Sequence, residues 1–294
     1  MECHHYYPKS THDYWEPSAN EKRLMRTQVE QAQRGTITPQ MQDIARSEGI
    51  GPHELCERIA AGSVVIMQRK KHYTGIGKGL FTKVNVNLGT SSTKICVDEE
   101  VQKARIAETF GADTISDLSM GGDINAIRKE IFSHTTLPVT TVPVYQAVAE
   151  HGLKMMTADD IMATLRMQAG QGISSMVIHG VNREMLGELR RKKRLLGVVS
   201  KGGSITSAFM LMNQCENPFV EHFDDVLSIC RRHDIVLSLG NTARSGCIHD
   251  RRDRMQLAKI RQNVQLAHHA DIMRGLLPPN PSVTMTAAAD GTSL

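Results

Sequence analysis

The sequence predicts an α/β fold: a TIM-like (β/α) barrel, incomplete at its C-terminal end and preceded by a small helical N-terminal region. Short apolar runs bounded by turn residues recur from about residue 80 onward, at intervals of roughly 20 to 40 residues that suit βα units. Amphipathic segments with capping residues separate these runs. Because no Gly-x-Gly-x-x-Gly follows the first run, an open doubly wound sheet is the second choice.

The composition is that of a globular protein and excludes several functional classes. Of the 294 residues, 40% are hydrophobic and 22% are charged, which argues against a disordered chain. The net charge is only +4 and aromatic residues make up 4%, so we expect no nucleic-acid partner. Without an apolar stretch of about 20 residues or an apolar leader, we expect a cytoplasmic protein with no membrane partner. Six scattered cysteines without a Cys-x-x-Cys pair predict reduced thiols and no metal site.

Composition divides the chain into four segments. They are an irregular N-terminal arm at residues 1–26, a helical N-terminal region at 27–78, the partial barrel at 79–281 and a disordered tail at 282–294. In the helical region a helix that starts after Thr27 closes at Gly35, and Pro39 and Pro52 each open another helix.

Six apolar runs are predicted to be strands of one parallel sheet: residues 81–88, 114–118, 139–145, 176–179, 195–199 and 235–239. A weak seventh candidate lies at residues 272–273. These strands are too few to close a barrel, so two strand edges and the apolar interior between them would be uncovered. We therefore expect a second chain to cover them.

Residue patterns between the runs predict the helices. Glu99 and Lys103 are spaced as a favourable i, i+4 ion pair on one helix. Thr157 caps another helix, and Asp160 at its third position completes a variant of the capping box. An apolar stripe within residues 219–230, with charged residues on the other side, predicts a third amphipathic helix.

Polar side chains follow the predicted strands, and parallel strands bring such ends to one mouth. Asn85 and Asn87 alternate with valines, so both amides face the same side, towards the barrel interior. Residues 200–204, Ser-Lys-Gly-Gly-Ser, precede a helix and predict an anion site on backbone N–H groups, or a simple βα turn. Arg244 is a bidentate donor for phosphate or a solvated side chain. For His179 two interpretations stay open: a group that shuttles a proton or donates a hydrogen bond to a ligand ring, or a core histidine whose hydrogen bonds are met within the protein.

Two other clusters are poor candidates for binding sites. The basic run at residues 190–194 lies before a predicted strand and lacks aromatics, which favours a solvated helix end over a nucleic-acid patch. The adjacent histidines His4 and His5, like His268 and His269, have no further ligands at metal-binding spacing. We therefore expect surface histidines there.

The strand-end segments resemble the phosphomethylpyrimidine synthase family, radical enzymes that make the thiamin pyrimidine, and its relatives that make 5-hydroxybenzimidazole for cobamides. The matching motifs run in order through about residues 27 to 275. They include Thr-Gln-Val-Glu-Gln-Ala at 27–32, Asn-Val-Asn-Leu-Gly at 85–89, Pro-Val-Tyr-Gln-Ala at 143–147, Ile-His at 178–179, Ser-Lys-Gly-Gly-Ser at 200–204 and Ser-Leu-Gly at 238–240.

This resemblance implies a (β/α) barrel behind a helical domain, a homodimer, and radical chemistry on 5-aminoimidazole ribotide. The family uses a [4Fe-4S] cluster, S-adenosylmethionine and zinc. Carried onto this sequence, the substrate contacts fall on Asn87, Ser116, Tyr145, His179, Ser200, Gly202, Gly203, Asn241 and Arg244. The phosphate of a ribotide suits the anion-binding segment described above.

The sequence also departs from the family pattern. Asn241-Thr242-Ala243-Arg244 stands where the family has Asp-Gly-x-Arg, and an amide cannot act as a base or balance a cation. Ser116 replaces a methionine, and residues 275–278 stand where the family has a Glu and a zinc-binding His. The last strand and the cluster-binding Cys-x-x-Cys-x-x-x-x-Cys have no counterpart in this sequence, so no cofactor has a complete site in it.

We therefore interpret the chain as a C-terminally truncated member of this carbon–carbon lyase family, with the ribotide pocket present and the radical machinery outside the chain. No catalytic residue is assigned. The alternative is a non-catalytic ribotide-binding or regulatory paralogue that associates with a full-length enzyme. Asn241 favours the alternative, whereas Gly202, Gly203 and Arg244 suit both hypotheses.

Overall fold

A parallel sheet of short strands forms the centre of the computed structural model, which describes residues 26–191, 194–272 and 283–285. The strands are β3 (Asn85–Leu88), β4 (Thr114–Asp117), β5 (Val139–Thr141), β6 (Ser175–Ile178), β7 (Val236–Leu239) and β8 (Val283–Met285). They lie side by side in chain order, and every neighbouring pair is parallel. The predicted α/β class and parallel sheet are confirmed.

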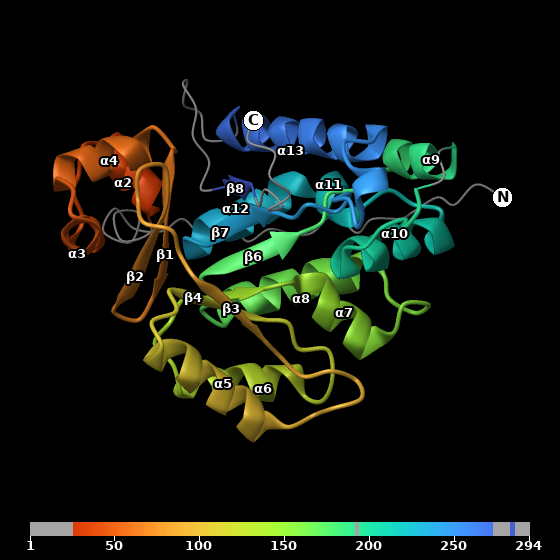
Figure 1. Ribbon diagram of the computed structural model, residues 1–294, viewed down its shortest axis with the longest axis horizontal. Helices are drawn as coiled ribbons and strands as arrows, with labels where there is room; N and C mark the ends of the chain where they lie inside the picture. The colour runs from red at the N-terminus through yellow and green to blue at the C-terminus, as the bar shows by residue number, and fades with distance from the viewer. Residues whose placement is uncertain (1–25, 192–193, 273–282, 286–294) are drawn as a thin grey trace, which may run out of the picture.

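Helices connect the strands and cover the sheet. They are α5 (Val97–Thr109), α6 (Ile124–Ser133), α7 (Pro143–His151), α8 (Ala158–Gly170), α9 (Arg183–Arg191), α10 (Lys201–Asn213), α11 (Pro218–Glu221), α12 (Phe223–His233) and α13 (Arg254–Ile272), with a short 3-10 turn at Ile248–Asp250. Figure 1 shows α5 and α6 on one side of the sheet and α13 on the other. The largest core cluster includes Leu165, Met176, Ile178, Phe209 and Leu237, all at most 2% exposed. Among the described residues, no helix is long and apolar enough to cross a bilayer.

The N-terminal helices form where the sequence predicts them: α2 (Gln28–Gln33), α3 (Pro39–Glu48) and α4 (Pro52–Ala60). Thr27 and Glu30 make a full capping box at the start of α2, and proline opens α3 and α4. Their facing apolar side chains, among them Met41, Ile44 and Leu55, form a separate small core.

The same region also contains an antiparallel hairpin that the sequence did not predict, β1 (Val64–Arg69) and β2 (His72–Gly77). Its two-residue turn is Lys70-Lys71, and Lys70 adopts a left-handed φ of 53°. Asn or Gly ordinarily marks such a turn, so the sequence carried no turn signal.

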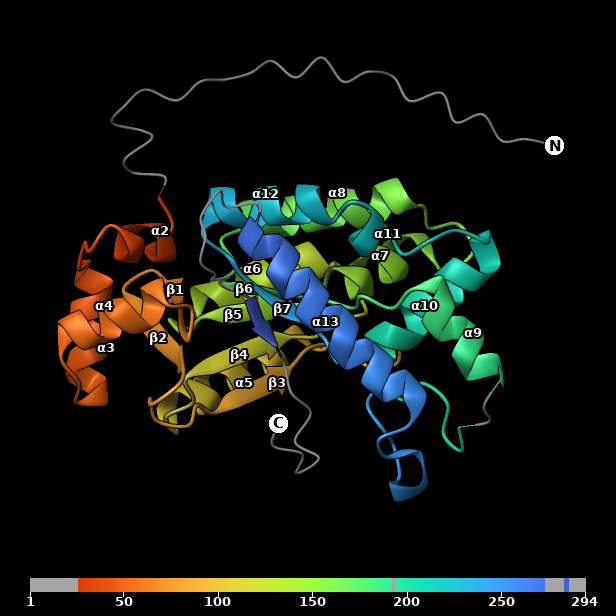
Figure 2. The ribbon, with the colours of Figure 1, turned by 90° about the horizontal axis from the view of Figure 1, so that it is seen from above.

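The hairpin covers the amino ends of the central strands. The hairpin forms hydrogen bonds to residues that lie just before or between those strands. They join Thr74 to Asp113, Arg69 to Phe132 and Thr135, and Gln68 to Ser174 and Asp234. Val65 and Met67 pack on Val236, the first residue of β7. Figure 2 shows the hairpin and helices α2 to α4 together at this end of the sheet. The carboxyl ends of the strands are therefore the ends left for a site.

Several predicted strands need correction. The segment 195–199 is not a strand: Asp250 accepts the backbone N–H groups of Leu195 and Leu196, and β6 pairs directly with β7. The third strand stops at Thr141, because Pro143 starts α7. Ile272 ends helix α13, and Met273 lies outside the described residues. Within the predicted disordered tail, β8 pairs with β7, and the rest of the tail lies outside the described residues.

Three predictions about side chains are also wrong. The expected pair of Glu99 with Lys103 does not form, since Lys103 pairs with Glu100 and Glu99 with Lys94. Arg194 is not solvated: its side chain is 2% exposed and pairs with Asp253 at 2.6 Å. The predicted stripe over residues 219–230 belongs to two helices, with a break at His222 between α11 and α12. The capping box of Thr157 and Asp160 is confirmed.

Candidate functional site

His179 is the centre of the candidate site, directly after β6. Two glycines flank its imidazole: a Cβ on Gly202 would lie 2.3 Å from His179 Cδ2 and Nε2, and one on Gly240 would lie 2.9 Å from Cε1. On the third side, His179 Nδ1 is 3.2 Å from Thr242 Oγ1 and 3.5 Å from Ser200 Oγ. The ring is 5% exposed and held from several directions at once. Both glycines therefore serve close approach to a ring.

The start of α10 forms the wall opposite β6. Ser200 caps this helix by accepting the N–H of Gly203 at 3.2 Å. The backbone N–H of Gly202 bonds to the hydroxyl of Tyr145. A Cβ on Gly203 would meet Thr242 Cγ2 at 2.6 Å. The glycine segment thus does begin a helix, but protein groups already take the N–H groups of Gly202 and Gly203, so the glycines chiefly make room for neighbouring side chains.

Tyr145 lies on a different element from the one predicted. The sequence placed it at the end of a strand, whereas it is the third residue of α7, the helix that packs on α10. Its ring lies 5.4 Å from Lys201 Nζ, within the range of a cation–π contact. Burial raises the pKa of Tyr145, and the Gly202 hydrogen bond and the charge of Arg244 partly oppose this shift.

The electrostatics of the site keep His179 neutral. Burial lowers its pKa to about 3, and the positive charges of Lys259 and Arg244 add to the effect. A neutral imidazole has one N–H donor and one nitrogen acceptor. Beside the phenol of Tyr145, it can hydrogen-bond a nitrogen-rich heterocycle, while Lys201 and Arg244 supply positive charge nearby.

Asn241 and Arg244 follow β7 and complete this group. Arg244 is partly buried, and its Nη1 donates to the carbonyl of Asn241 at 3.4 Å. The buried oxygen Oδ1 of Asn241 has no protein partner among the described residues. A buried amide oxygen without a partner is costly, which makes Asn241 a candidate contact for a donor on a ligand.

Asn87 and Ser116 form a second polar group at the other end of the sheet. They pair in register across β3 and β4. Asn85 connects them, accepting from Ser116 Oγ at 3.1 Å and donating to Asn87 Oδ1 at 3.1 Å. The predicted common face of Asn85 and Asn87 is confirmed, although both side chains are exposed. Of the nine predicted residues, seven thus gather around His179, and these two do not bond to that group.

A buried ion pair lies between the two groups, at the carboxyl end of β4. Arg128 of α6 donates from Nε to Asp117 at 2.9 Å, and both side chains are at most 3% exposed. Arg128 also donates to Gln146 and Gln171. This network joins α6, α7 and α8 below the site.

Sequence reasoning missed four residues that build the site: Gly240, Thr242, Asn217 and Lys259. Asn217 precedes Pro218 and caps α11, a pattern that marks a helix start. Lys259 is 0% exposed on the face of α13 that also buries Met255 and Leu266. Helical spacing places Lys259 on that face, but lysine is rarely buried, so the sequence alone does not predict its burial.

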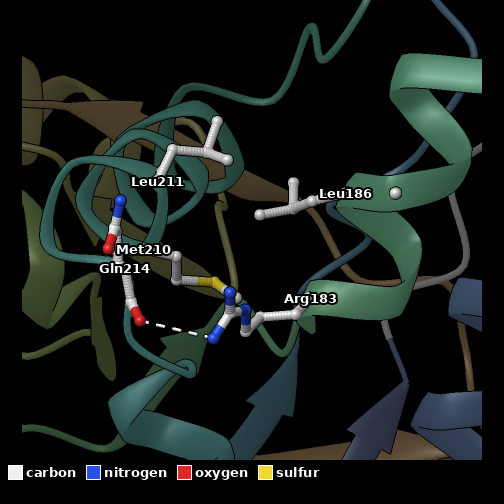
Figure 3. A pocket seen from close by; sticks show the side chains of 6 residues that line it. Arg183, Leu186, Met210, Leu211 and Gln214 are labelled. Carbon is white, nitrogen blue, oxygen red and sulfur yellow. Dashed lines mark hydrogen bonds between the residues drawn. The ribbon is translucent and has the colours of Figure 1, made fainter.

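A separate pocket of about 330 Å³ lies between α9 and the far end of α10 (Figure 3). It is lined by Arg183, Leu186, Gly187, Met210, Leu211 and Gln214. Arg183 spans it, donating to the carbonyl of Gln214 at 3.3 Å. None of the nine predicted residues lines this pocket.

Comparison with known proteins identifies the family. A family model described as the radical SAM ThiC family matches residues 27–274. The chain belongs to the radical SAM ThiC family. It is 44% identical over 244 residues to the phosphomethylpyrimidine synthase of Dehalococcoides mccartyi strain CBDB1, covering 80% of this chain and 57% of that relative.

Two further relatives carry different names. The phosphomethylpyrimidine synthase 2 of Methanosarcina barkeri is 41% identical over 254 residues, which cover 84% of this chain and 59% of that protein. The 5-hydroxybenzimidazole synthase of Geobacter sulfurreducens is 42% identical over 253 residues, 83% of this chain and 58% of that protein. The chain therefore matches less than three fifths of the length of these ThiC relatives.

The family implies an iron–sulfur cluster with S-adenosylmethionine, and zinc, so we tested the described residues against such ligands. No three His, Cys, Asp or Glu side chains converge as a metal site within the described ranges. Cys56 and Cys230 are buried in the protein interior, and burial raises the pKa of Cys56, which disfavours a thiolate ligand. The described residues therefore do not fit the cluster.

Proposed function

We propose that this ThiC chain binds 5-aminoimidazole ribotide at the carboxyl ends of its strands and forms the substrate-binding half of a ThiC-type lyase site. The observation that carries the proposal is the neutral imidazole of His179, held between Gly202 and Gly240 beside Tyr145 and Arg244. The imidazole and phenol suit a neutral aminoimidazole ring, and the unpartnered oxygen of Asn241 suits an amino group. Arg244 and Lys201 suit the phosphate.

The proposed function also implies that the sheet is an arc of a (β/α) barrel. Its strand order follows chain order without reversal, as in a barrel, whereas a doubly wound sheet reverses order at a switch point. A barrel carries its site at the carboxyl ends of the strands, and the hairpin covers the opposite ends. In this arrangement Asn87 and Ser116 reach the ligand from the far side of the mouth.

Thermal unfolding with and without ligand tests the proposed function. 5-Aminoimidazole ribotide should raise the melting temperature, while the corresponding riboside, which lacks the phosphate, should raise it less. Arg244→Ala should weaken ribotide binding by ~1.5–3 kcal/mol, the range for a hydrogen bond to a charged group, and leave riboside binding nearly unchanged. Equal stabilisation by ribotide and riboside would refute the phosphate assignment.

Asn241 favours a second candidate function, ribotide binding without turnover. The family pattern has a carboxylate at this position, and the Asn241 amide cannot take up a proton or balance a cationic intermediate. Asn241→Asp distinguishes the two functions when the chain is assayed together with a cluster-bearing family member. A gain of product formation with Asn241→Asp supports the binding role for the natural chain, and equal activity of both forms supports the lyase role.

A further inference from the structure

The backbone that carries His179 is held by side chains from two distant helices. After β6 ends at Ile178, Asn217 Nδ2 donates to the carbonyls of both His179 and Val181, each at 2.7 Å. Lys259 Nζ donates to the carbonyl of the residue between them, Gly180, at 3.1 Å. All three successive carbonyls are therefore fixed, although none of the three residues belongs to the sheet.

Both side chains are buried completely, at 0% exposure. Asn217 also caps α11, and its Oδ1 accepts the N–H of Phe219 at 3.1 Å. Lys259 has two further acceptors, the amide oxygens of Gln262 and Asn263. Asn263 in turn donates to the carbonyl of Leu239 at 3.2 Å, so α13 reaches the end of β7 as well.

Stability alone does not explain a lysine at this place. Its three acceptors are neutral oxygens, so none of them neutralises its charge, and burial lowers the pKa of Lys259 to about 7. Burying an ammonium group without a carboxylate costs folding free energy, and an apolar side chain of similar length would avoid that cost. What the lysine does supply is a donor for Gly180 and a positive charge near His179.

We propose that Asn217 and Lys259 are positioning residues that fix the 179–181 backbone and thereby hold the imidazole of His179 between Gly202 and Gly240. The ring has little freedom to shift, because no Cβ fits between it and the backbone at Gly202 or Gly240: an added Cβ would lie 2.3 Å and 2.9 Å from ring atoms. The ligand-binding part of this inference rests on the proposed function, since His179 then contacts the ribotide.

The first readout needs no ligand. Imidazole ¹⁵N signals of the full chain are recorded between about pH 5 and 8, and His179 is assigned by their loss in His179→Gln. In the natural chain His179 should remain neutral with one dominant tautomer, because the fixed ring gives its two nitrogens different surroundings: Nδ1 faces the hydroxyls of Thr242 and Ser200, and Nε2 faces Gly202. In Lys259→Met and Asn217→Ser, the Nδ1 and Nε2 signals should move towards each other as both tautomers become populated.

The second readout is the dissociation constant of 5-aminoimidazole ribotide, which should rise by up to about tenfold in each variant, the size expected when one hydrogen bond to the ligand is weakened. Ser174→Ala is the matched control. Ser174 is 2% exposed and lies just before the opposite end of β6, where its Oγ donates to the carbonyl of Gln68 at 2.8 Å. It should lower stability while leaving the His179 signals and the affinity unchanged.

Unchanged His179 signals in both folded variants, or equal changes in Ser174→Ala, would overturn the proposal. If Lys259→Met does not fold, Lys259→Gln, which keeps one donor, takes its place, and Asn217→Ser retains an oxygen to cap α11. If the natural chain binds no ribotide, the proposed function fails, but the nitrogen signals still decide the positioning role.

Discussion

Replacing Gly202 by alanine tests how tightly the site is packed. The new methyl group would lie 2.3 Å from His179 Cδ2 and Nε2 and 3.2 Å from Tyr145 Cε1. The imidazole cannot retreat freely, because Gly240 lies on its other side, where even an added Cβ would come within 2.9 Å of Cε1. Overpacking of this kind costs about 1–3 kcal/mol. Against it stands the helix propensity of alanine over glycine, at most about 1 kcal/mol in the first turn of α10.

The steric cost is therefore larger, and we expect Gly202→Ala to lower the free energy of unfolding by about 1–2 kcal/mol and to abolish ribotide stabilisation. Gly187→Ala is the matched control, because Gly187 lies inside α9 and a Cβ there meets nothing within 4 Å. It should stabilise the chain by about 0.5–1 kcal/mol. Urea unfolding measures both changes. If Gly202→Ala is as stable as the natural chain, the close packing around His179 is wrong.

Three further predictions concern stability and assembly. Arg128→Met should lower the free energy of unfolding in urea by about 3–5 kcal/mol, because it leaves the buried carboxylate of Asp117 unpaired. Adding Asp117→Asn should recover part of this loss, and no recovery would contradict the ion-pair explanation. The pKa of Lys259 is about 7 in the folded chain and 10.5 in the unfolded chain, so between these pH values only the unfolded chain keeps the proton. The free energy of unfolding should therefore rise with pH in this range, by up to about 1.4 kcal/mol per pH unit relative to Lys259→Met. Equal slopes for the two proteins would refute the buried charge. We also expect a homodimer in sedimentation at micromolar concentration, since Phe81 and Phe110 are 70% and 84% exposed near the edge strand β3. The double variant Phe81→Lys and Phe110→Lys should sediment as a monomer. A natural chain that is already monomeric would contradict the expectation.

The sequence predicted β3 to β7 from their apolar runs, and it wrongly predicted a strand at residues 195–199, where the run has no strand to pair with. Leu195 and Leu196 have the apolarity of a strand, but β6 and β7 already pair with each other, and Asp250 takes the free N–H groups. Local hydrophobicity does not report whether a neighbouring strand edge is available. The hairpin was missed for a different reason: only β1 contains an apolar run, at residues 64–67, and Lys70 gives no turn signal.

The candidate site was predictable where it depends on local chemistry. A helix start after residues 200–204 and His179 after a strand follow from short-range patterns, and the structure brings Ser200 and His179 within 3.5 Å of each other. Tyr145 was placed on the wrong element, although Pro143 two residues earlier is a helix-start signal. Asn217 and Lys259 act over separations of 38 and 79 residues, and no local pattern reports contacts of that range.

The hairpin over the amino ends of the strands has a consequence for synthesis on the ribosome. The hydrogen bond from Gln68 to Asp234 cannot form until Asp234, 166 residues later, has been synthesised. At about 5–20 residues per second, this interval is roughly 10–30 s, during which Val65 and Met67 lack the apolar partner Val236 that covers them in the folded chain. The nascent chain therefore carries an unfinished apolar surface for most of its translation. Slow translation beyond residue 77 would lengthen the exposure of this surface.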